Sequence, residues 1–368
     1  MAFLADAGLR VRLYERSAIA AGASGRNSGI VQQPLDPVLA DLYRRTVAAY
    51  RELEAATDGA FRLPRAPAGL LYVGRDRAVA AAEAARWAAT WPAAQAQVLA
   101  EDELLALEPA LAPDLVACRL EIGFPIEPGS ATIAFADLAR RRGVEVVLGS
   151  TVVPAVIHGR VAGVMRDGSL EPAGNVVVAA GPWTPAAVDP SGRWRPIRPI
   201  WGVVLAVALA AAPRHGLEAI DIDIEPDEPG STRAGDDGPR PAADAGVDFS
   251  LVPAVGSSAL GSTFLTEEPD PAAYVEAIRR LGSRYVPAVA DAPLLGLRHC
   301  ARPVSLDGRP LVGAAPWADG LWICAGHGPW GISTGAGSAR LLADQIVGRG
   351  PAGIPSALAG DRFGEPAA

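Results

Sequence analysis

The residues that could do chemistry begin with a carboxylate at the end of a short apolar run. Residues 9–14 alternate between apolar and polar side chains, which is typical of a strand with one buried face, and Glu15 follows directly. In a doubly wound dinucleotide-binding fold, a carboxylate at this position accepts hydrogen bonds from a ribose diol. The next segment holds Gly25, Arg26 and Gly29, so backbone can approach a ligand closely and a guanidinium is available for a phosphate. The alternative is a strand that ends in a solvated Glu-Arg pair, followed by a flexible loop.

Two later segments have the form of an apolar strand that enters a glycine turn. Residues 175–180 predict a fully apolar strand that runs into Gly181, and Asp167-Gly168 predicts a hairpin before it. Residues 321–325 predict a second strand, followed by a Gly-rich turn around His327 and a helix of small residues. The start of that helix offers free N–H groups and the positive end of its dipole. The alternative for the first segment is an ordinary hairpin with a buried strand.

Composition excludes several classes of protein. The 368 residues allow one large or two medium domains with a sizeable core. The net charge of −8, with no basic patch, argues against nucleic acid, and no apolar run is long enough to span a membrane. No signal peptide is visible, so we expect a cytoplasmic protein. The cysteines and histidines are scattered along the chain, so neither a disulfide framework nor a metal site is expected.

The first segment resembles a known family of flavoproteins. The letters VRLYER followed by GASGRNSG are similar to the second strand and following loop of the D-amino acid oxidase-like enzymes, which include glycine oxidase and sarcosine oxidase. The resemblance implies that the glutamate binds the adenosine ribose of FAD and that the loop runs under the pyrophosphate and flavin. The cofactor-binding residues implied in this segment are Glu15, Arg16, Ser24, Gly25, Arg26, Asn27 and Gly29.

The two glycine-turn segments extend the resemblance. VVVAAGPWTP and LWICAGHGPWGISTGAG are similar to the family's later cofactor segments. The resemblance implies that backbone at Val152 or Val153 holds the adenine and that the final helix faces the flavin edge where negative charge collects on reduction. The further cofactor-binding residues implied are Ala180, Gly181, Trp183, Gly326, Gly328 and Gly331.

Candidate catalytic residues lie in LRHCARPVSLDGRPLVG, which resembles the family's RPxxxDGxPxxG segment. The resemblance implies that Arg302 clamps the substrate carboxylate, a bidentate contact that lysine would not reproduce. A structural ion pair or a flavin contact is the alternative for Arg302. His327 is the second candidate, either as a flavin donor or as a packed turn residue. In sarcosine oxidase-like members, a cysteine at the position of Cys300 binds flavin covalently. The Arg-Pro pair that follows Cys300 here favours non-covalent FAD.

The resemblance also implies the fold. We expect an α/β protein with a discontinuous Rossmann-like FAD-binding domain, a substrate domain of the α+β type with a large antiparallel sheet, and a C-terminal tail. Residues 1–8 predict the end of a helix, so the family's first strand and GxGxxG turn, about 15 to 20 residues, are expected to be missing. Residues Asp221 to Asp244 predict a mobile loop. The FAD-binding domain is expected to contain residues 1–45, 130–198 and 296–350. The substrate domain is expected to contain residues 46–129 and 199–295, and the tail residues 351–368.

The implied function is FAD-dependent oxidation of an amino acid, an N-methyl amino acid or another small amine by hydride transfer to the flavin. Electrons would then pass to oxygen or to an electron carrier. A 2-hydroxy acid dehydrogenase on the same scaffold is the alternative enzyme, because fold does not fix substrate. A truncated, non-catalytic remnant that holds no FAD is the alternative without activity. An NAD-dependent dehydrogenase would also use a strand-end glutamate, but it would not need the two C-terminal segments.

Overall fold

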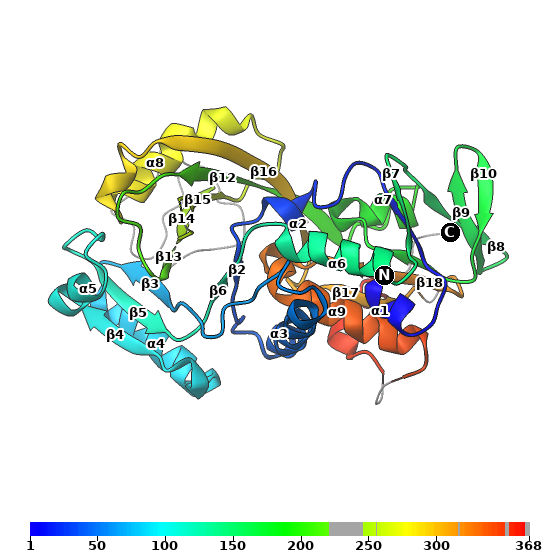
Figure 1. The fold of residues 1–368 in the computed structure, drawn as a ribbon, viewed down its shortest axis with the longest axis horizontal. Helices are drawn as coiled ribbons and strands as arrows, with labels where there is room; N and C mark the ends of the chain where they lie inside the picture. Colours follow the sequence, from blue (N-terminus) through cyan, green and yellow to red (C-terminus); the bar gives the residue numbers. More distant parts are fainter. Residues whose placement is uncertain (221–245, 255, 316, 350–352, 365–368) are drawn as a thin grey trace.

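The computed structural model describes residues 1–220, 246–254, 256–315, 317–349 and 353–364. The loop predicted from Asp221 to Asp244 lies outside the described residues. The described chain forms two regions that lie side by side along the longest axis of the molecule, and α2, β2 and β6 lie where the two regions meet (Figure 1). Among the described helices, none is both long and apolar enough to cross a lipid bilayer.

One region is built on a single eight-stranded sheet. Its strands, in spatial order, are β16 (Leu294–Ser305), β12 (Ile197–Val207), β15 (Ser258–Thr263), β14 (Val247–Val252), β13 (Gly216–Ala219), β3 (Leu70–Gly74), β5 (Val116–Leu120) and β4 (Gln97–Ala100). The pair β13 and β3 is parallel and the other neighbours are antiparallel. The sheet is therefore mixed, which corrects the expected antiparallel sheet. The chain leaves this region after β5 and returns before β12. A long connection therefore separates β3 from β13, and such a connection allows the two strands to pair in parallel.

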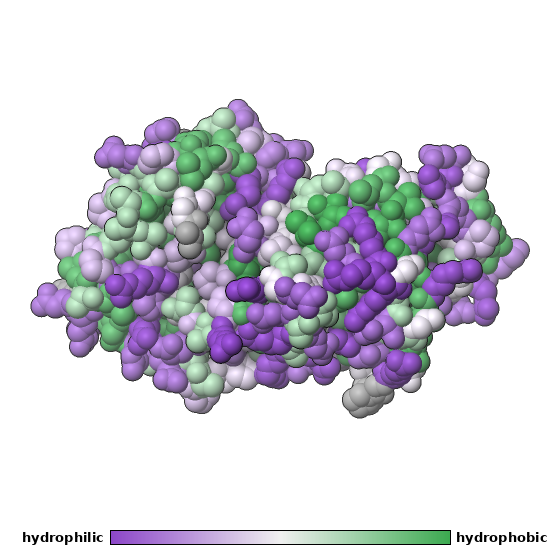
Figure 2. Space-filling view, in the orientation of Figure 1, coloured by the Kyte–Doolittle hydropathy of each residue, from purple (hydrophilic) through white to green (hydrophobic). Residues whose placement is uncertain are grey.

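The two faces of this sheet differ in what covers them. Leu71, Leu217 and Leu205 point to an outer face, where α8 (Val275–Ser283) completes a large apolar core. Their neighbours Tyr72 and Val204 point to the opposite, inner face, part of which packs against α4 (Arg77–Thr90). This alternation follows from the period of two along a strand, and it fixes which residues share the inner face. Figure 2 shows hydrophobic residues gathered over α8, with polar residues around them.

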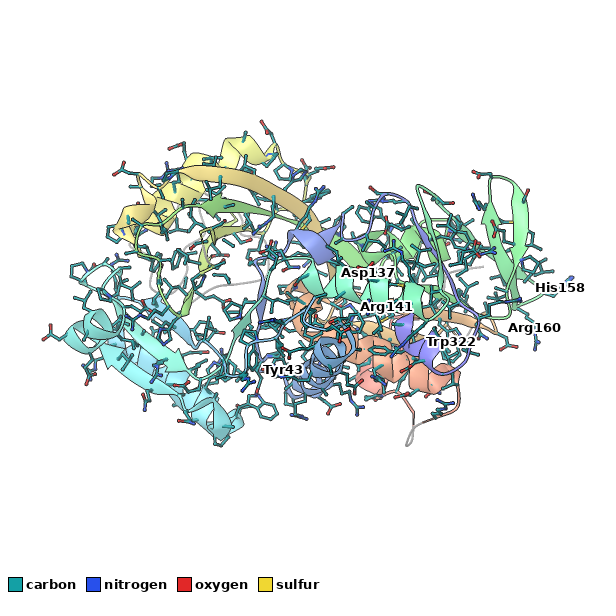
Figure 3. The ribbon with its side chains drawn as sticks, in the orientation of Figure 1. Tyr43, Asp137, Arg141, His158, Arg160 and Trp322 are labelled. Atoms are coloured by element: carbon teal, nitrogen blue, oxygen red, sulfur yellow. The ribbon has the colours of Figure 1, made fainter. Side chains whose placement is uncertain are left out.

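The other region divides its strands among smaller sheets. β1 (Arg12–Glu15) pairs in parallel with β7 (Glu145–Leu148), and β18 (Leu321–Ala325) lies between parallel β11 (Val176–Val178) and antiparallel β17 (Leu311–Ala314). A third sheet contains the antiparallel strands β8 (Val153–Ile157), β9 (Arg160–Arg166) and β10 (Ser169–Pro172). The hairpin predicted at Asp167-Gly168 is confirmed, because both residues adopt positive φ between β9 and β10. His158 and Arg160 lie at the far end of this sheet (Figure 3).

Helices hold this divided region together. The contact between α3 (Pro37–Ala56) and α9 (Gly331–Ile346) is close, since the Gly337 amide donates to Thr46 Oγ1 at 2.9 Å and the Tyr50 hydroxyl donates to a carbonyl of α9. Asp36 caps α3 by accepting from two amides of its first turn. The remaining helices are α1 (Ala2–Asp6), α2 (Ala23–Arg26), α5 (Glu101–Leu107), α6 (Ser130–Arg141) and α7 (Thr184–Val188). A short pair, β2 (Ile30–Val31) with β6 (Phe124–Pro125), connects the regions.

Candidate functional site

Strand β16 brings the three predicted cofactor segments together. It contacts α2, the short helix η2 (Gly181–Trp183) and the short helix η6 (Gly328–Trp330). The Arg26 guanidinium donates to the His299 carbonyl on β16 at 3.1 Å. Val304, near the end of the same strand, forms a β-bridge with His327. Segments that are separated by as much as 300 residues in sequence therefore meet along one strand.

The first two segments meet at the end of β1. Glu15 ends this strand, as the sequence predicted, and its Oε1 accepts from the Ser17 amide at 2.8 Å. The next guanidinium, that of Arg16, stacks over the Trp183 ring at 3.6 Å from the ring centroid. The Ser150 amide, which follows β7, donates to the Glu15 carbonyl at 3.0 Å. A carboxylate, an indole and the chain leading to Val152 thus lie at one end of the region.

Apolar side chains remain exposed at this same end. Trp183, Val153 and Leu148 are each more than 40% exposed, although such side chains usually prefer burial. Figure 2 shows a hydrophobic patch over the part of the surface where α7 and β7 lie in Figure 1. An exposed apolar surface beside a carboxylate is suited to a flat aromatic base that carries a hydroxylated sugar.

The loop from residue 20 to residue 29 is held by its own contacts. Asn27 donates to the Ser24 carbonyl at 3.0 Å and accepts from the Gly29 amide at 2.9 Å. Gly25 lies so close to Ala20 that a Cβ could not be accommodated. Asn27 and Gly25 therefore fix the shape of the loop, and Arg26 projects from it toward β16.

The two glycine turns are open where a ligand would approach. Gly181 has a φ of +58° and nothing within 4 Å of where its Cβ would be, and Gly328 has a φ of +53° with its nearest neighbour 3.9 Å away. Backbone conformation, rather than crowding, therefore requires glycine at both positions. Gly331 begins α9, and no described side chain caps this end of the helix. Its free N–H groups match the predicted role of facing a group that gains negative charge.

The two remaining small residues of these turns have different surroundings. Gly326 has a φ of +86°, and the side chains of Leu311 and Ile197 lie 3.2 and 3.4 Å from where its Cβ would be, so here packing also favours glycine. Ala180 is exposed beside η2.

His327 lies behind the glycine turn. Its ring is buried, with Nε2 at 3.0 Å from Ser338 Oγ on α9. Burial lowers the pKa of His327 to about 4, so the ring is neutral at pH 7. The ring therefore links the turn to α9, while the His327 backbone pairs with β16.

Arg302 projects onto the inner face of the large sheet. Its guanidinium lies over Gly202, donates to the Thr263 carbonyl at 2.7 Å and to Ser262 Oγ, and stacks on the Phe264 ring. Burial lowers its pKa, yet a guanidinium remains charged at neutral pH. Since the group has five N–H donors, these two contacts leave donors for a carboxylate.

A carboxylate on the same inner face was missed by the sequence analysis. Glu218 lies between Leu217 and Ala219, which belong to the outer core, so it points to the inner face. The side-chain nitrogen Nε2 of Gln32 donates to Glu218 Oε2 at 3.4 Å. The backbone N–H of Gln32 donates at 3.0 Å to Oγ of Ser333, which lies at the start of α9. Burial raises the pKa of Glu218 to about 7. The only signal in the sequence is a charged residue inside a short apolar strand.

A buried contact between Glu108 and His215 fixes the start of the strand that carries Glu218. Glu108 Oε1 accepts from the amides of Arg214 and His215 at 2.8 and 2.9 Å, and it also contacts His215 Nδ1 at 2.5 Å. Both side chains of the Glu108–His215 pair are buried. The pair lies on the approach to β13, so its role is to position that strand. Across the described residues, no three His, Cys, Asp or Glu side chains are grouped as metal ligands.

Comparison with known proteins agrees with this arrangement. A family model described as FAD dependent oxidoreductase matches residues 2–345. A D-amino acid dehydrogenase from Cereibacter sphaeroides is 31% identical over 283 residues, which cover 74% of this chain and 60% of that protein. A D-amino acid dehydrogenase from Methylobacterium nodulans is 30% identical over 342 residues, which cover 86% of this chain and 71% of that protein.

Solved structures share the fold. A glycine oxidase from Bacillus cereus superposes with a TM-score of 0.77 at 21% identity, over 95% of this chain and 91% of that one. An iminodiacetate oxidase from a Chelativorans species gives 0.78 at 21% identity, over 99% of this chain and 95% of that one. The expected fold class, a Rossmann-like cofactor region beside a second region with a large sheet, is confirmed. The chain belongs to the DAO family of FAD-dependent oxidoreductases.

Proposed function

We propose that this protein oxidises an amino acid, an N-methyl amino acid or another small amine, with FAD as the hydride acceptor. The observation that carries the proposal is the position of strand β16. The strand holds Arg302 on the inner face of the sheet, and it contacts all three segments expected to hold the cofactor. A substrate carboxylate held by Arg302 would therefore lie beside the cofactor.

The residues present fit FAD at two places. Glu15, Trp183 and the chain at Val152 would hold the adenosine, because they offer a carboxylate and exposed apolar surface. Gly181, Gly328 and the uncapped start of α9 would hold the flavin end, because their backbone is open to a ligand. When bound, FAD supplies the ring that accepts a hydride from carbon.

The chain's own residues supply orientation and charge. Arg302 is fixed by the Thr263 carbonyl and by the Phe264 ring, so its free donors have a defined direction. A carboxylate bound there has few orientations available, which lowers the entropic cost of reaction. His327 is neutral and engaged with Ser338, so it stabilises the turn.

We propose that FAD is bound without a covalent link. Cys300 is the candidate for attachment, but burial raises the pKa of its thiol although the guanidinium groups of Arg302, Arg26 and Arg298 act in the opposite direction. The thiolate is the nucleophilic form, and it is scarce when the pKa is raised. Acid precipitation of the protein should therefore release the flavin into the supernatant, whereas a covalent flavin would stay with the pellet.

The proposal is tested by anaerobic reduction of the flavin-loaded protein. D- and L-amino acids, sarcosine and 2-hydroxy acids are added in turn, and bleaching of the flavin absorbance is followed. Reduction by an amine substrate supports the proposal, and reduction only by 2-hydroxy acids would contradict it. Reoxidation is then followed with oxygen and with an artificial carrier dye, because the acceptor is either oxygen or a carrier.

The Arg302→Lys variant tests the carboxylate clamp. It should lower the reduction rate at low substrate by about 100-fold or more, since lysine cannot make the bidentate contact. Arg77→Lys is the matched control, because Arg77 is exposed at the start of α4. Equal rates in the two variants would remove Arg302 from the site.

A further inference from the structure

Glu218 and Gln32 form a pair of hydrogen-bond acceptors on the inner face of the large sheet. The Gln32 side-chain nitrogen already donates to Glu218. The oxygen of the same amide, Gln32 Oε1, is buried without a hydrogen-bond partner among the described residues. Gln32 is only 6% exposed, so water does not readily satisfy this oxygen. A carboxylate and an unsatisfied amide oxygen therefore lie together.

The pair faces the same side of the sheet as Arg302, at some distance from it. Arg302 reaches Ser262 and Thr263 on β15, and Glu218 lies on β13, two strands away. Glu218 is in register with Ser250, which is in register with Gly261, two residues before Thr263. The backbone positions of Thr263, which binds the guanidinium, and of Glu218 are separated by two strand spacings and two residues along the strand, which amounts to about 12 Å.

Two small residues lie on the inner face between these two charges, Gly261 on β15 and Ser250 on β14. Asp248, on the same face of β14, is an electrostatic neighbour of Arg302. Leu205 and Leu251 point to the outer face, and Val204 is an inner-face side chain beside Gly261. An extended ligand with opposite charges at its two ends would therefore cross the sheet over Gly261 and Ser250.

The chemistry of the two acceptors selects the ligand. The half-buried Glu218 carboxylate and the unsatisfied buried Gln32 oxygen can both accept from a donor, and an ammonium has three N–H groups. Where Glu218 is ionised, a neutral ligand would leave its carboxylate without a counter-charge. A second carboxylate would be repelled.

We propose that Glu218 and Gln32 bind the side-chain ammonium of a basic amino acid whose α-carboxylate is held by Arg302. This inference rests on the proposed function and names its substrate class, lysine or a close homologue. Six single bonds of about 1.5 Å separate the carboxyl carbon from the side-chain nitrogen of lysine, giving about 7 Å when extended. A hydrogen-bond contact of about 3 Å at each end then brings the span close to the separation of the Thr263 and Glu218 backbone positions.

The first experiment measures binding without catalysis. 6-Aminohexanoate has the carboxylate and the ammonium of lysine at the same spacing but no α-amine, and hexanoate lacks the ammonium. Calorimetric titration of the flavin-loaded protein should show that 6-aminohexanoate binds about 30-fold more tightly than hexanoate. Glu218→Gln should abolish most of this difference, and Gln32→Leu should reduce it. Glu276→Gln, which changes an exposed carboxylate on α8, should leave it unchanged.

The second experiment compares lysine with norleucine, which has a methyl group in place of the ammonium-bearing end. Wild-type protein should reduce its flavin more efficiently with lysine than with norleucine, and in Glu218→Gln the ratio of the two efficiencies should fall to about one. Equal binding of 6-aminohexanoate and hexanoate, or an equal loss for lysine and norleucine in Glu218→Gln, would overturn the inference. If 6-aminohexanoate binds as described but no amino acid reduces the flavin, the acceptor pair stands and the proposed function fails.

Discussion

The two regions of this protein position their functional groups in different ways. In the region with the eight-stranded sheet, Arg302, Gly202 and Glu218 lie within strands, and the pairing register fixes which of them share a face. In the other region, the expected cofactor groups lie on turns at strand ends, and the strands are divided among separate sheets. The proposed substrate end therefore depends on side-chain packing across one continuous sheet. The proposed cofactor end depends on loop conformation and on the contact between α3 and α9.

The largest effect should follow from filling the space that Gly202 leaves for Arg302. In Gly202→Ala, the new Cβ would overlap the Arg302 guanidinium, so the clamp must move although the arginine itself is unchanged. We expect kcat/KM for a carboxylate substrate to fall about 100-fold, because a displacement of about 1 Å is enough for that loss. Flavin content should stay the same if the two regions are positioned independently.

Gly296→Ala is the matched control for this change. Gly296 lies on β16, the strand that carries Arg302, and nothing lies within 4 Å of where its Cβ would be. Its kinetic constants should equal those of the wild type. A similar loss in both variants would mean that β16 is disturbed as a whole and that the Arg302 position is not the cause.

A smaller effect, on stability, is expected from disturbing the contact between helices α3 and α9. In Gly337→Ala, the new Cβ would overlap the Leu42 carbonyl on α3, which is backbone and cannot rotate away. The free energy of unfolding should fall by about 2 kcal/mol, and flavin should be released at a lower temperature. Thermal unfolding followed by flavin fluorescence measures both.

Gly335, two residues before Gly337 on α9, should respond to alanine with a gain in stability. Gly335 has nothing within 4 Å of where its Cβ would be, so Gly335→Ala should stabilise the protein by about 0.5 to 1 kcal/mol through helix propensity. Equal destabilisation by both alanines would show that the contact with α3 does not limit stability.

The smallest effect concerns the pH dependence of stability. Burial raises the pKa of Glu218 to about 7, above its usual value near 4.5, so the folded protein holds a proton that the unfolded chain has lost. Stability should therefore fall as pH rises from about 4.5 to about 7. The titratable residues on the strands next to β13 are Tyr72 and Asp248, and the raised pKa of Tyr72 keeps its hydroxyl neutral over this range.

Glu218→Gln tests this expectation because it removes the titrating group. The variant should be more stable than the wild type at pH 8 by about 1 to 2 kcal/mol, after allowance for solvent screening, and by much less at pH 5. Thermal unfolding at the two pH values gives the comparison. Identical differences at both would show that Glu218 does not titrate in this window.

Local patterns predicted the parts of the fold that local interactions determine. The strand predicted at residues 321–325 is confirmed as β18, because an apolar run that ends at a glycine acts over a few residues. Strand β15, Ser258–Thr263, has no such local signal. Its small residues lack the β-branched pattern of a strand, and pairing with β12 and β14 determines where it begins.

The substrate end could be predicted only in part. Arg302 was proposed from a motif and stays a prediction, whereas Gly202 is of interest only because strand pairing brings it under that guanidinium. Glu218 was missed because a carboxylate in a short strand has the pattern of an exposed residue. Its burial and its contact with Gln32, 186 positions away, come from tertiary packing alone.

The central claim is that Glu15, the glycine turns and the start of α9 form one binding site for FAD. Titration of the flavin-free protein with FAD and with FMN, followed by flavin fluorescence, tests it most directly. We predict saturable binding of one FAD per chain, at least about tenfold tighter than FMN, and loss of that preference in Glu15→Gln, because only FAD carries the adenosine ribose. Absence of saturable binding, or equal affinities for FAD and FMN, would contradict the account.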